Sequence, residues 1–186
     1  CCPGNGGIEA DAECIDMKAT DLDGVVSFAT QNAIDFVVVA PDDPLAMGMV
    51  DALNAKGIKT FGPSKLAAEI ESSKVFSKNL MKQYQIPTAG YEVFGNSAEA
   101  IDYVKQQNQF PMVIKADGLA LGKGVIIAED MQQAIDGVTS IMEDKVFGAS
   151  GNQIVIEEFM TGPEVSVLAF TDGKTVKPMV SSMDHK

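Results

Sequence analysis

Apolar and polar residues alternate in the first third of the chain with the spacing of an α/β unit. Over residues 1–62 the pattern predicts strand, helix, strand, helix and strand, in that order. The continuous apolar run over 36–40 is typical of a strand buried on both faces of a parallel sheet. The expected elements are a strand before residue 21, a helix from 21, a strand over 36–40, a proline-bounded break over 41–44, a helix over 45–55 and a strand over 58–61.

The rest of the chain predicts two joined helices and then a sheet that pairs with further helices. Asparagine and aspartate at residues 96 and 130 are helix-capping residues, and Asp172-Gly173 is a typical hairpin turn. The expected elements are helices over 64–84 that meet near Ser72-Ser73, an extended segment over 88–94, helices over 96–107 and 130–143, strands over 112–116, 125–128 and 153–158, a loop over 148–151, and strands over 164–171 and 175–183.

Composition narrows the classes of protein. The 186 residues are 46% hydrophobic and 22% charged, which is ordinary globular composition. No apolar run approaches the roughly 20 residues that a membrane helix needs. The net charge is −12 and all 14 basic residues are lysines, so nucleic acid is not an expected partner. Three cysteines, two of them adjacent, do not form a disulfide framework and are typical of a reducing cytoplasm.

A glycine-bearing loop between two predicted strands is the first candidate for chemistry. It is not a P-loop, because three residues separate Gly118 from Gly122 and because Lys123 is followed by Gly124. Glycine lets a backbone approach a ligand, successive N–H groups can bind an anion, and Lys115 and Lys123 add positive charge. The pattern is equally compatible with a surface hairpin whose lysines are solvated.

The segment after the next predicted strand is the second candidate. The strand ends in Glu157 and Glu158 and turns at Gly162, as at the edge of a cleft. Backbone groups there can pair with an adenine edge, and Glu164 can accept from both ribose hydroxyls. Taken alone, two glutamates that face solvent at a strand end are the commoner arrangement.

Two isolated positions complete the candidates. Lys74 follows Glu71-Ser72-Ser73 near a predicted helix start, where it could meet a phosphate, although a lone lysine is usually solvated. The single histidine, His185, stands between Asp184 and Lys186, and a lone histidine in such a position is more often incidental than catalytic.

In this order the features resemble one family. The stretch 114–125 is similar to the phosphate-covering lid of phosphoribosylamine–glycine ligases, ATP-grasp enzymes of purine biosynthesis that are also called glycinamide ribonucleotide synthetases. The other resembling segments are Pro3-Gly4-Asn5-Gly6-Gly7 on the substrate side, Phe61-Gly62-Pro63-Ser64 and Glu71-Ser72-Ser73-Lys74 at the entry to the ATP-binding part, Ile156-Glu157-Glu158-Phe159 and Glu164-Val165-Ser166 at the hinge, and Met183-Asp184-His185-Lys186.

The resemblance implies an α/β fold with a defined division of the chain. A partial Rossmann-like N-terminal domain is followed by the first part of an ATP-grasp domain, including its lid subdomain. The expected parts are an incomplete N-terminal domain over 1–63, connecting helices and the start of the ATP-grasp core over 64–94, the lid over 95–156, and the hinge with the first, truncated core strands over 157–186.

The resemblance also implies a reaction. ATP phosphorylates the carboxylate of glycine, and 5-phosphoribosylamine captures the glycyl phosphate to give glycinamide ribonucleotide, ADP and phosphate. In-line phosphoryl transfer needs positioning and charge neutralisation, so a histidine or cysteine nucleophile is not required. The expected partners are the small molecules ATP, glycine and 5-phosphoribosylamine, without nucleic acid or membrane, and the expected location is cytoplasmic.

Residue roles follow from the resemblance, position by position. Lys74 and Lys115 would contact ATP phosphates, Glu157 would approach the adenine amino group, and Glu164 would hold the ribose. The catalytic residues implied are Lys115 and Lys123. The ATP-binding residues implied are Lys74, Lys115, Asp117, Gly118, Gly122, Lys123, Gly124, Glu157, Glu158, Phe159, Met160 and Glu164. The substrate-side residues implied are Gly4, Asn5, Pro44, Asp184, His185 and Lys186.

The chain also departs from the family. Leu121 replaces a usual alanine, Ser72 a usual glycine, and Asp42-Asp43 a proline-flanked glutamate, so only Pro44 is carried over there. The family's first strand, its sugar-phosphate loop and its later Glu and Asn ligands for Mg²⁺ have no counterpart in this sequence. We therefore expect a fragment that is itself inactive, with Mg²⁺ bound only in the full-length enzyme. The alternatives are a non-catalytic nucleotide-binding fragment and another ATP-grasp carboxylate–amine ligase.

Overall fold

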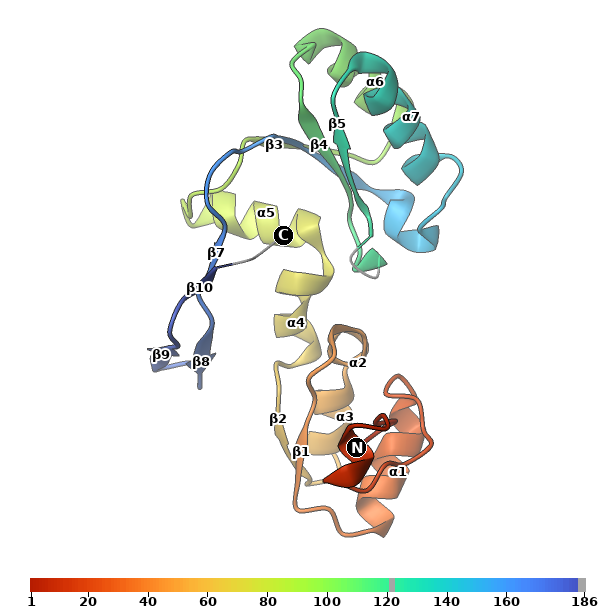
Figure 1. Cartoon of the computed structure of the whole chain (residues 1–186), viewed down its shortest axis with the longest axis vertical. Coiled ribbons are helices and arrows are strands. Elements are labelled where there is room, and N and C mark those ends of the chain that lie inside the picture. Colours follow the sequence, from red (N-terminus) through yellow and green to blue (C-terminus); the bar gives the residue numbers. More distant parts are fainter. Residues whose placement is uncertain (121–122, 184–186) are drawn as a thin grey trace.

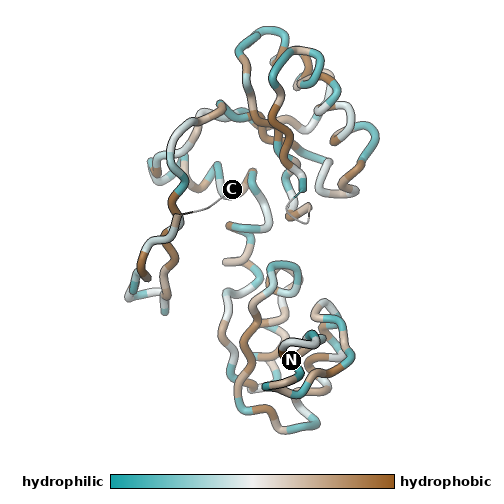
Figure 2. Tube along the Cα trace, in the orientation of Figure 1, coloured by the Kyte–Doolittle hydropathy of each residue, from teal (hydrophilic) through white to brown (hydrophobic). Residues whose placement is uncertain are grey.

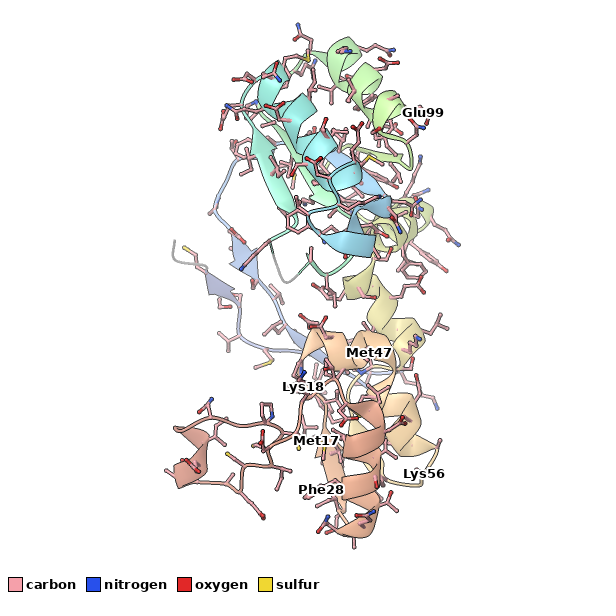
Figure 3. The ribbon with its side chains drawn as sticks, turned by 90° about the vertical axis from the view of Figure 1, so that its right-hand side faces the viewer. Met17, Lys18, Phe28, Met47, Lys56 and Glu99 are labelled. Carbon is pink, nitrogen blue, oxygen red and sulfur yellow. The ribbon has the colours of Figure 1, made fainter. Side chains whose placement is uncertain are left out.

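The computed structural model describes residues 1–120 and 123–183. Figure 1 shows an N-terminal unit and a larger sheet-containing unit, which two consecutive helices, α4 (Lys65–Ser72) and α5 (Lys74–Gln83), connect. In the side view of Figure 3, Glu99 lies in the larger unit, whereas Met47 and Lys56 lie in the N-terminal one. None of the described helices is long and apolar enough to cross a membrane.

The N-terminal unit contains one pair of parallel strands with helices beside it. Asp21 begins the first long helix as expected, since its carboxylate accepts from Gly24 N at 3.0 Å. The register joins Phe36 to Lys59 and Val38 to Phe61. The elements are η1 (Ile8–Ala10), α1 (Leu22–Gln31), β1 (Phe36–Val38), α2 (Asp42–Met47), α3 (Met49–Asn54) and β2 (Lys59–Phe61).

The prediction of a strand before residue 21 is wrong. Within the described residues this stretch forms the short 3-10 helix η1 and no strand. The Asn5 side chain accepts from Gly7 N and Ile8 N, both at 3.0 Å, and so bends the chain at that point. A side-chain hydrogen bond of this kind competes with extended structure, which explains why a turn forms here.

Strand β1 is not buried on both faces, which corrects a second prediction. Phe36 is 54% exposed and Val38 is 60% exposed, whereas Val37 packs against the N-terminal core. Alternate side chains of a strand point to opposite faces, and the packed face is the one that the helical residues Ala29 and Leu53 cover. Figure 2 shows this apolar run as a brown stretch along β1.

The single helix predicted over 45–55 is instead two short helices, α2 and α3. Gly48 separates them with φ +99°, a left-handed conformation that favours glycine. The strand does end before 41–44 as predicted, but the helix starts earlier than residue 45, because Pro41 is the N-cap and Asp42 begins α2. Carboxylates and a proline are both compatible with a first helical turn, so these residues start a helix rather than interrupt one.

The helices α4 and α5 meet where the sequence predicts. Ser64 caps α4 by accepting from Ala67 N at 3.2 Å, and Ser73 caps α5 by accepting from Phe76 N at 3.0 Å. Ser73 has extended backbone angles, so the chain changes direction there before the second helix begins. The two serines therefore set both starting points of the connection.

The larger unit is a four-stranded antiparallel sheet with the order β3-β6-β4-β5. Its strands and helices agree closely with the predicted ranges, and Asn96 and Asp130 cap the helices as expected. The predicted loop over 148–151 is a 3-10 helix. The elements are β3 (Tyr91–Phe94), α6 (Ser97–Gln107), β4 (Met112–Ala116), β5 (Val125–Ala128), α7 (Met131–Met142), η3 (Gly148–Asn152) and β6 (Ile154–Glu158).

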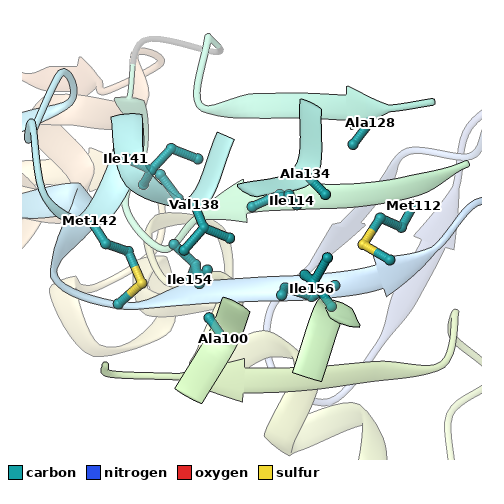
Figure 4. Close-up of a cluster of buried hydrophobic side chains, with 12 residues drawn as sticks. Ala100, Met112, Ile114, Ala128, Ala134, Val138, Ile141, Met142, Ile154 and Ile156 are labelled. Atoms are coloured by element: carbon teal, nitrogen blue, oxygen red, sulfur yellow. The ribbon is translucent and has the colours of Figure 1, made fainter. Parts of the chain in front are cut away.

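Helices α6 and α7 cover one face of this sheet and form the main core with it (Figure 4). Ile114 of β4 and Ile154 of β6 are fully buried beneath Val138 and Ile141 of α7. The core residues of β4 are Met112, Ile114 and Ala116, so the alternating side chains, including that of Lys115, point to the opposite face. The opposite face carries the candidate site.

The last described segment forms two small antiparallel pairs rather than two long strands. Asp172 accepts from Thr175 N at 2.7 Å and from Lys174 N at 2.9 Å, as the predicted hairpin turn requires. These backbone N–H groups lower the pKa of the exposed Asp172 carboxyl. The strands are β7 (Val165–Ser166), β8 (Ala169–Thr171), β9 (Val176–Pro178) and β10 (Ser182–Met183), with β8 pairing β9 and β7 pairing β10.

Candidate functional site

A cavity of about 290 Å³ lies between α5 and the sheet face opposite the core. Most of its polar lining is charged, in contrast to the apolar core on the other face. Its polar lining residues are Glu71, Lys74, Ser77, Lys78, Lys115 and Glu157. Leu119 and Gly124, from the loop between β4 and β5, also contribute to the wall, so the loop and the helix face the same space.

Two lysines meet one buried carboxylate at the centre of this cavity. Lys115 Nζ lies 3.0 Å and Lys78 Nζ lies 3.1 Å from the same oxygen, Glu157 Oε2. The side chain of Glu157 is 5% exposed and that of Lys78 is 9% exposed, whereas that of Lys115 is 28% exposed. The carboxylate is therefore paired away from solvent, and one of its partners is more accessible than the other.

Strand register brings this group together. Val113 of β4 lies opposite Glu157 of β6, so Lys115 is the diagonal neighbour of Glu157 on the same face. Lys78 comes from α5, one helical turn after Lys74, so both helical lysines face the sheet. The sequence produces the site because α5 contributes two lysines and the strands β4 and β6 contribute one charged residue each to the same space.

The other oxygen of Glu157 has no partner among the described residues. Oε1 is buried and accepts no hydrogen bond there. Buried polar atoms are nearly always paired, so this acceptor has room for a further donor. An N–H or O–H group of a bound molecule or of water can be that donor.

The glycine loop, residues 117–124, is fixed to the start of α5 through its described part. Asp117 Oδ1 accepts from Val75 N at 2.8 Å and from Ser73 Oγ at 3.0 Å. The Asp117 carbonyl accepts from Lys74 N at 3.1 Å, and Lys74 Nζ donates to the Gly118 carbonyl at 2.8 Å. The carboxylate of Asp117, a residue expected to bind ATP, is thus hydrogen-bonded to the start of α5.

Two glycines of this loop are required by close packing. A Cβ on Gly118 would overlap the Ser150 side chain, and one on Gly124 would lie 2.7 Å from the Ala120 Cβ. Neither position can take a larger residue without a shift of its neighbours. The loop is thus packed closely at both ends as well as hydrogen-bonded to α5.

Burial lowers the pKa of the Lys74 ammonium below its ordinary value of 10.5. The Asp117 carboxylate opposes this shift, the positive charge of Lys115 adds to it, and Glu71 and Glu157 oppose it. The net direction is downward, so the desolvation of a half-buried ammonium outweighs the attraction of three carboxylates. Keeping Lys74 charged therefore lowers the stability of the folded chain.

This shift predicts a pH-dependent stability difference between the wild-type chain and Lys74→Met. The folded chain binds fewer protons at Lys74 than the unfolded chain does, in the window between the lowered pKa and 10.5. Stability of the wild type should therefore rise relative to Lys74→Met as the pH increases through that window. Urea unfolding of both proteins at pH 7 and at about pH 10 measures it, and a constant difference would contradict the shift.

The predicted site residues separate into three groups. Lys74, Lys115, Gly124 and Glu157 line the cavity, with Asp117 and Gly118 beside it. Lys123 is exposed at the loop, and Glu158 instead pairs with Gly90, whose N–H it accepts at 3.0 Å. Phe159 and Met160 follow β6 and are 39% and 66% exposed.

The substrate-side positions lie elsewhere. Gly4, Asn5 and Pro44 belong to the N-terminal unit and are not among the residues that line the cavity. Pro44 is buried in α2 and Asn5 makes the turn described above. Gly122, Leu121, Asp184, His185 and Lys186 lie outside the described residues.

Sequence reasoning missed Lys78 as a site residue. Its spacing of four from Lys74 places both side chains on one face of α5, and that is the signal that could have found it. As for metals, residues 1–120 and 123–183 contain no group of three or more His, Cys, Asp or Glu side chains that could hold an ion.

The lysine-bearing loop between antiparallel strands, packed over a carboxylate-bearing strand and a connecting helix, fits the ATP-grasp class of ligase folds. Comparison with protein families agrees: residues 72–186 match "Phosphoribosylglycinamide synthetase, ATP-grasp (A) domain", and residues 1–71 match the N domain of the same enzyme. The chain belongs to the phosphoribosylglycinamide synthetase family.

Individual relatives agree with this assignment. The chain is 47% identical over 186 residues to the phosphoribosylamine–glycine ligase of Clostridium acetobutylicum, and 44% identical to that of Haemophilus influenzae. The two alignments include 100% and 99% of this chain, but only 44% and 43% of the length of the two relatives.

Solved structures agree as well. The crystal structure of phosphoribosylamine–glycine ligase from Thermotoga maritima matches with a TM-score of 0.76 at 29% identity, covering 96% of this chain and 42% of that one. D-alanyl-alanine synthetase A from Vibrio cholerae, at 22% identity and a TM-score of 0.65, covers 81% of this chain and 45% of that one. The second likeness shows the fold alone.

Proposed function

We propose that this chain forms the lid side of the ATP site of a phosphoribosylamine–glycine ligase. The observation that carries the proposal is the cavity that Lys74, Lys115 and Glu157 line together, where Glu157 Oε1 is buried without a partner among the described residues. An adenine amino group would supply the N–H that Oε1 lacks, and the lysines would neutralise phosphate oxygens. The residues present therefore fit ATP.

In the proposed reaction the chain supplies positioning and charge rather than a covalent group. A glycine carboxylate oxygen attacks the γ-phosphorus of ATP, the bond to the β-phosphate oxygen breaks, and ADP leaves. The amine of 5-phosphoribosylamine then attacks the acyl carbon, the C–O bond to phosphate breaks, and the amine loses a proton. Lys115 and Lys123 would neutralise the transferred group, and the packed glycine loop would exclude water from the acyl phosphate.

The remaining assignments are part of the same proposal. Glu164 would bind the ribose, the backbone through Met160 would meet the adenine edge, and Gly4, Asn5 and Pro44 would lie toward glycine and the sugar. The division of the chain at 63, 94 and 156 is proposed with them. Mg²⁺ supplies charge neutralisation at the phosphates in such ligases, and the described residues do not offer a ligand set for it.

The site assignment is tested by titrating the 186-residue chain with ATP and with adenosine, and by following its amide signals by NMR. Both ligands should shift signals of β4, β6 and α5, and Glu157→Gln should weaken both. Glu92→Gln is the matched control, because Glu92 is exposed on the neighbouring strand β3. Shifts confined to other parts of the chain, or equal effects of the two variants, would show that the cavity is not a nucleotide site.

The reaction is tested in a chimera in which this chain replaces the 44% of the Clostridium acetobutylicum ligase that it matches. The chimera should release ADP when both glycine and 5-phosphoribosylamine are supplied, and the isolated chain should not. Nucleotide binding by the chain without turnover by a folded chimera would favour a nucleotide-binding role alone. Turnover by the isolated chain would show that the active site has been assigned to the wrong set of residues.

A further inference from the structure

We propose that Lys78 is a positioning residue that keeps Glu157 neutralised, so that Lys115 is free to move from this carboxylate to a bound nucleotide phosphate. The proposal rests on the proposed function and adds a division of labour between two lysines. Lys78 is the permanent counter-ion and Lys115 the exchangeable one. The two lysines share one carboxylate oxygen, their ammonium groups have unequal surroundings, and the carboxylate is buried.

The shared oxygen makes the two contacts interchangeable. Lys78 and Lys115 both approach Glu157 Oε2, at 3.1 and 3.0 Å, while Oε1 is buried without a partner among the described residues. One lysine is enough to neutralise one carboxylate. Departure of the other would leave the charge balanced and the carboxylate held in the same orientation.

The two ammonium groups differ in what else holds them. Lys78 Nζ also donates to Thr88 Oγ1 at 2.8 Å and lies 5.4 Å from the centre of the Tyr91 ring. Among residues 1–120 and 123–183, the Lys115 ammonium group has Glu157 as its one hydrogen-bond partner. The Lys115 side chain is also about three times as exposed, at 28% against 9%. Lys115 is therefore the partner that can leave.

The burial of Glu157 explains why the second lysine is needed. Removing the sole partner of a buried carboxylate is strongly unfavourable, because an uncompensated charge remains away from water. With Lys78 in place, Lys115 can transfer to phosphate without this penalty. Without Lys78, the attraction of Glu157 holds Lys115 on the carboxylate and out of reach of the phosphates. Lys78 would thus act on ATP binding without touching ATP.

The test compares the ATP-to-adenosine affinity ratio of the 186-residue chain and its variants, measured by NMR titration. Lys78→Met should reduce the ratio roughly tenfold or more, the effect of one charge-assisted contact to phosphate. Lys115→Met should reduce it similarly, and the double variant should fall no further. Adding Glu157→Gln to Lys78→Met should restore the ratio, because a neutral amide no longer retains Lys115. A purely structural role for Lys78 would not give this recovery.

A measurement on the wild-type chain avoids dependence on the folding of Lys78→Met. Acetylation of lysines, read residue by residue by mass spectrometry, should modify Lys115 faster than Lys78, and ATP should protect Lys115 while leaving Lys78 unchanged. Exposed Lys82, on the same helix, serves as the reference.

The outcomes separate the two proposals. Two outcomes would overturn the different roles of the two lysines and leave the nucleotide site intact. In one, the ATP-to-adenosine affinity ratio falls in Lys115→Met but not in Lys78→Met. In the other, adding Glu157→Gln to Lys78→Met does not restore the ratio. Protection of Lys78 instead of Lys115 by ATP would also overturn these roles. An absence of any nucleotide effect in the wild-type chain would overturn the site itself, and the proposal with it.

Discussion

Lys115→Ala is expected to weaken ATP binding roughly 10- to 150-fold while leaving adenosine binding nearly unchanged. Lys115 supplies charge-assisted hydrogen bonds to phosphate in the proposed complex, and such bonds are worth about 1.5–3 kcal/mol. Adenosine has no phosphate, and Lys78 continues to neutralise Glu157 when Lys115 is absent. Calorimetry or NMR titration with both ligands, in the chain or in the chimera described above, measures the difference.

Two further variants make this prediction specific. Lys82→Ala removes the same charge from the exposed side of α5 and should change neither affinity by more than about twofold, as expected of a surface charge. Glu164→Ala should weaken ATP and adenosine alike, because the ribose belongs to both ligands. If Lys115→Ala and Glu164→Ala gave the same ATP-to-adenosine ratio, the phosphate and ribose assignments would both be wrong.

Ile114→Ala is expected to reduce the free energy of unfolding by about 2–5 kcal/mol, the usual range for such a truncation in a core. Ile114 is fully buried at the centre of the four-stranded sheet, and its Cδ1 atom lies against Gly137 of α7. Because α7 packs directly on this strand, the sheet has little freedom to close the cavity that the truncation leaves. Urea unfolding of the wild-type chain and the variant measures the loss, and the slope of unfolding free energy against urea concentration should be the same for both.

The neighbouring strand offers a matched control for this stability effect. Ile127 of β5 undergoes the same chemical change in Ile127→Ala but is 49% exposed, so its loss should be well below that of Ile114→Ala. Similar losses for the two variants would mean that the face covered by α6 and α7 is not the main core of this unit.

The sheet of the larger unit was predictable from sequence because its signals are local. The strands over 112–116 and 125–128 agree residue for residue with the predicted ranges, and capping residues set the starts of the helices. The N-terminal unit was less predictable. Asn5 forms a side-chain turn that an alternation pattern does not reveal, and Gly48 divides a continuous apolar periodicity into two helices. Both features depend on backbone conformation rather than on hydrophobicity.

The candidate site was predictable from the sequence in some of its members, but not in its contacts. Lys74, Lys115 and Glu157 are each recognisable from their motifs, and the structure places all three around one cavity. That Lys78 shares the oxygen with Lys115 depends on the register of β4 and β6 and on the orientation of α5, which no single motif encodes. Asp117 shows the same limit, because its carboxylate accepts from Val75 N, 42 residues earlier in the chain.

Because Asp117 is hydrogen-bonded to the start of α5, amides of that helix can be used to follow the contacts of Asp117. The amides of Lys74 and Val75 find their acceptors on Asp117 rather than within α5. Whenever the loop separates from the helix, these two amides become available to solvent while the later turns of α5 remain hydrogen-bonded. The hydrogen-exchange rates of these two amides therefore depend on how often the Asp117 contacts open. A ligand that stabilises these contacts would slow the exchange of both amides together, without any label on the loop itself.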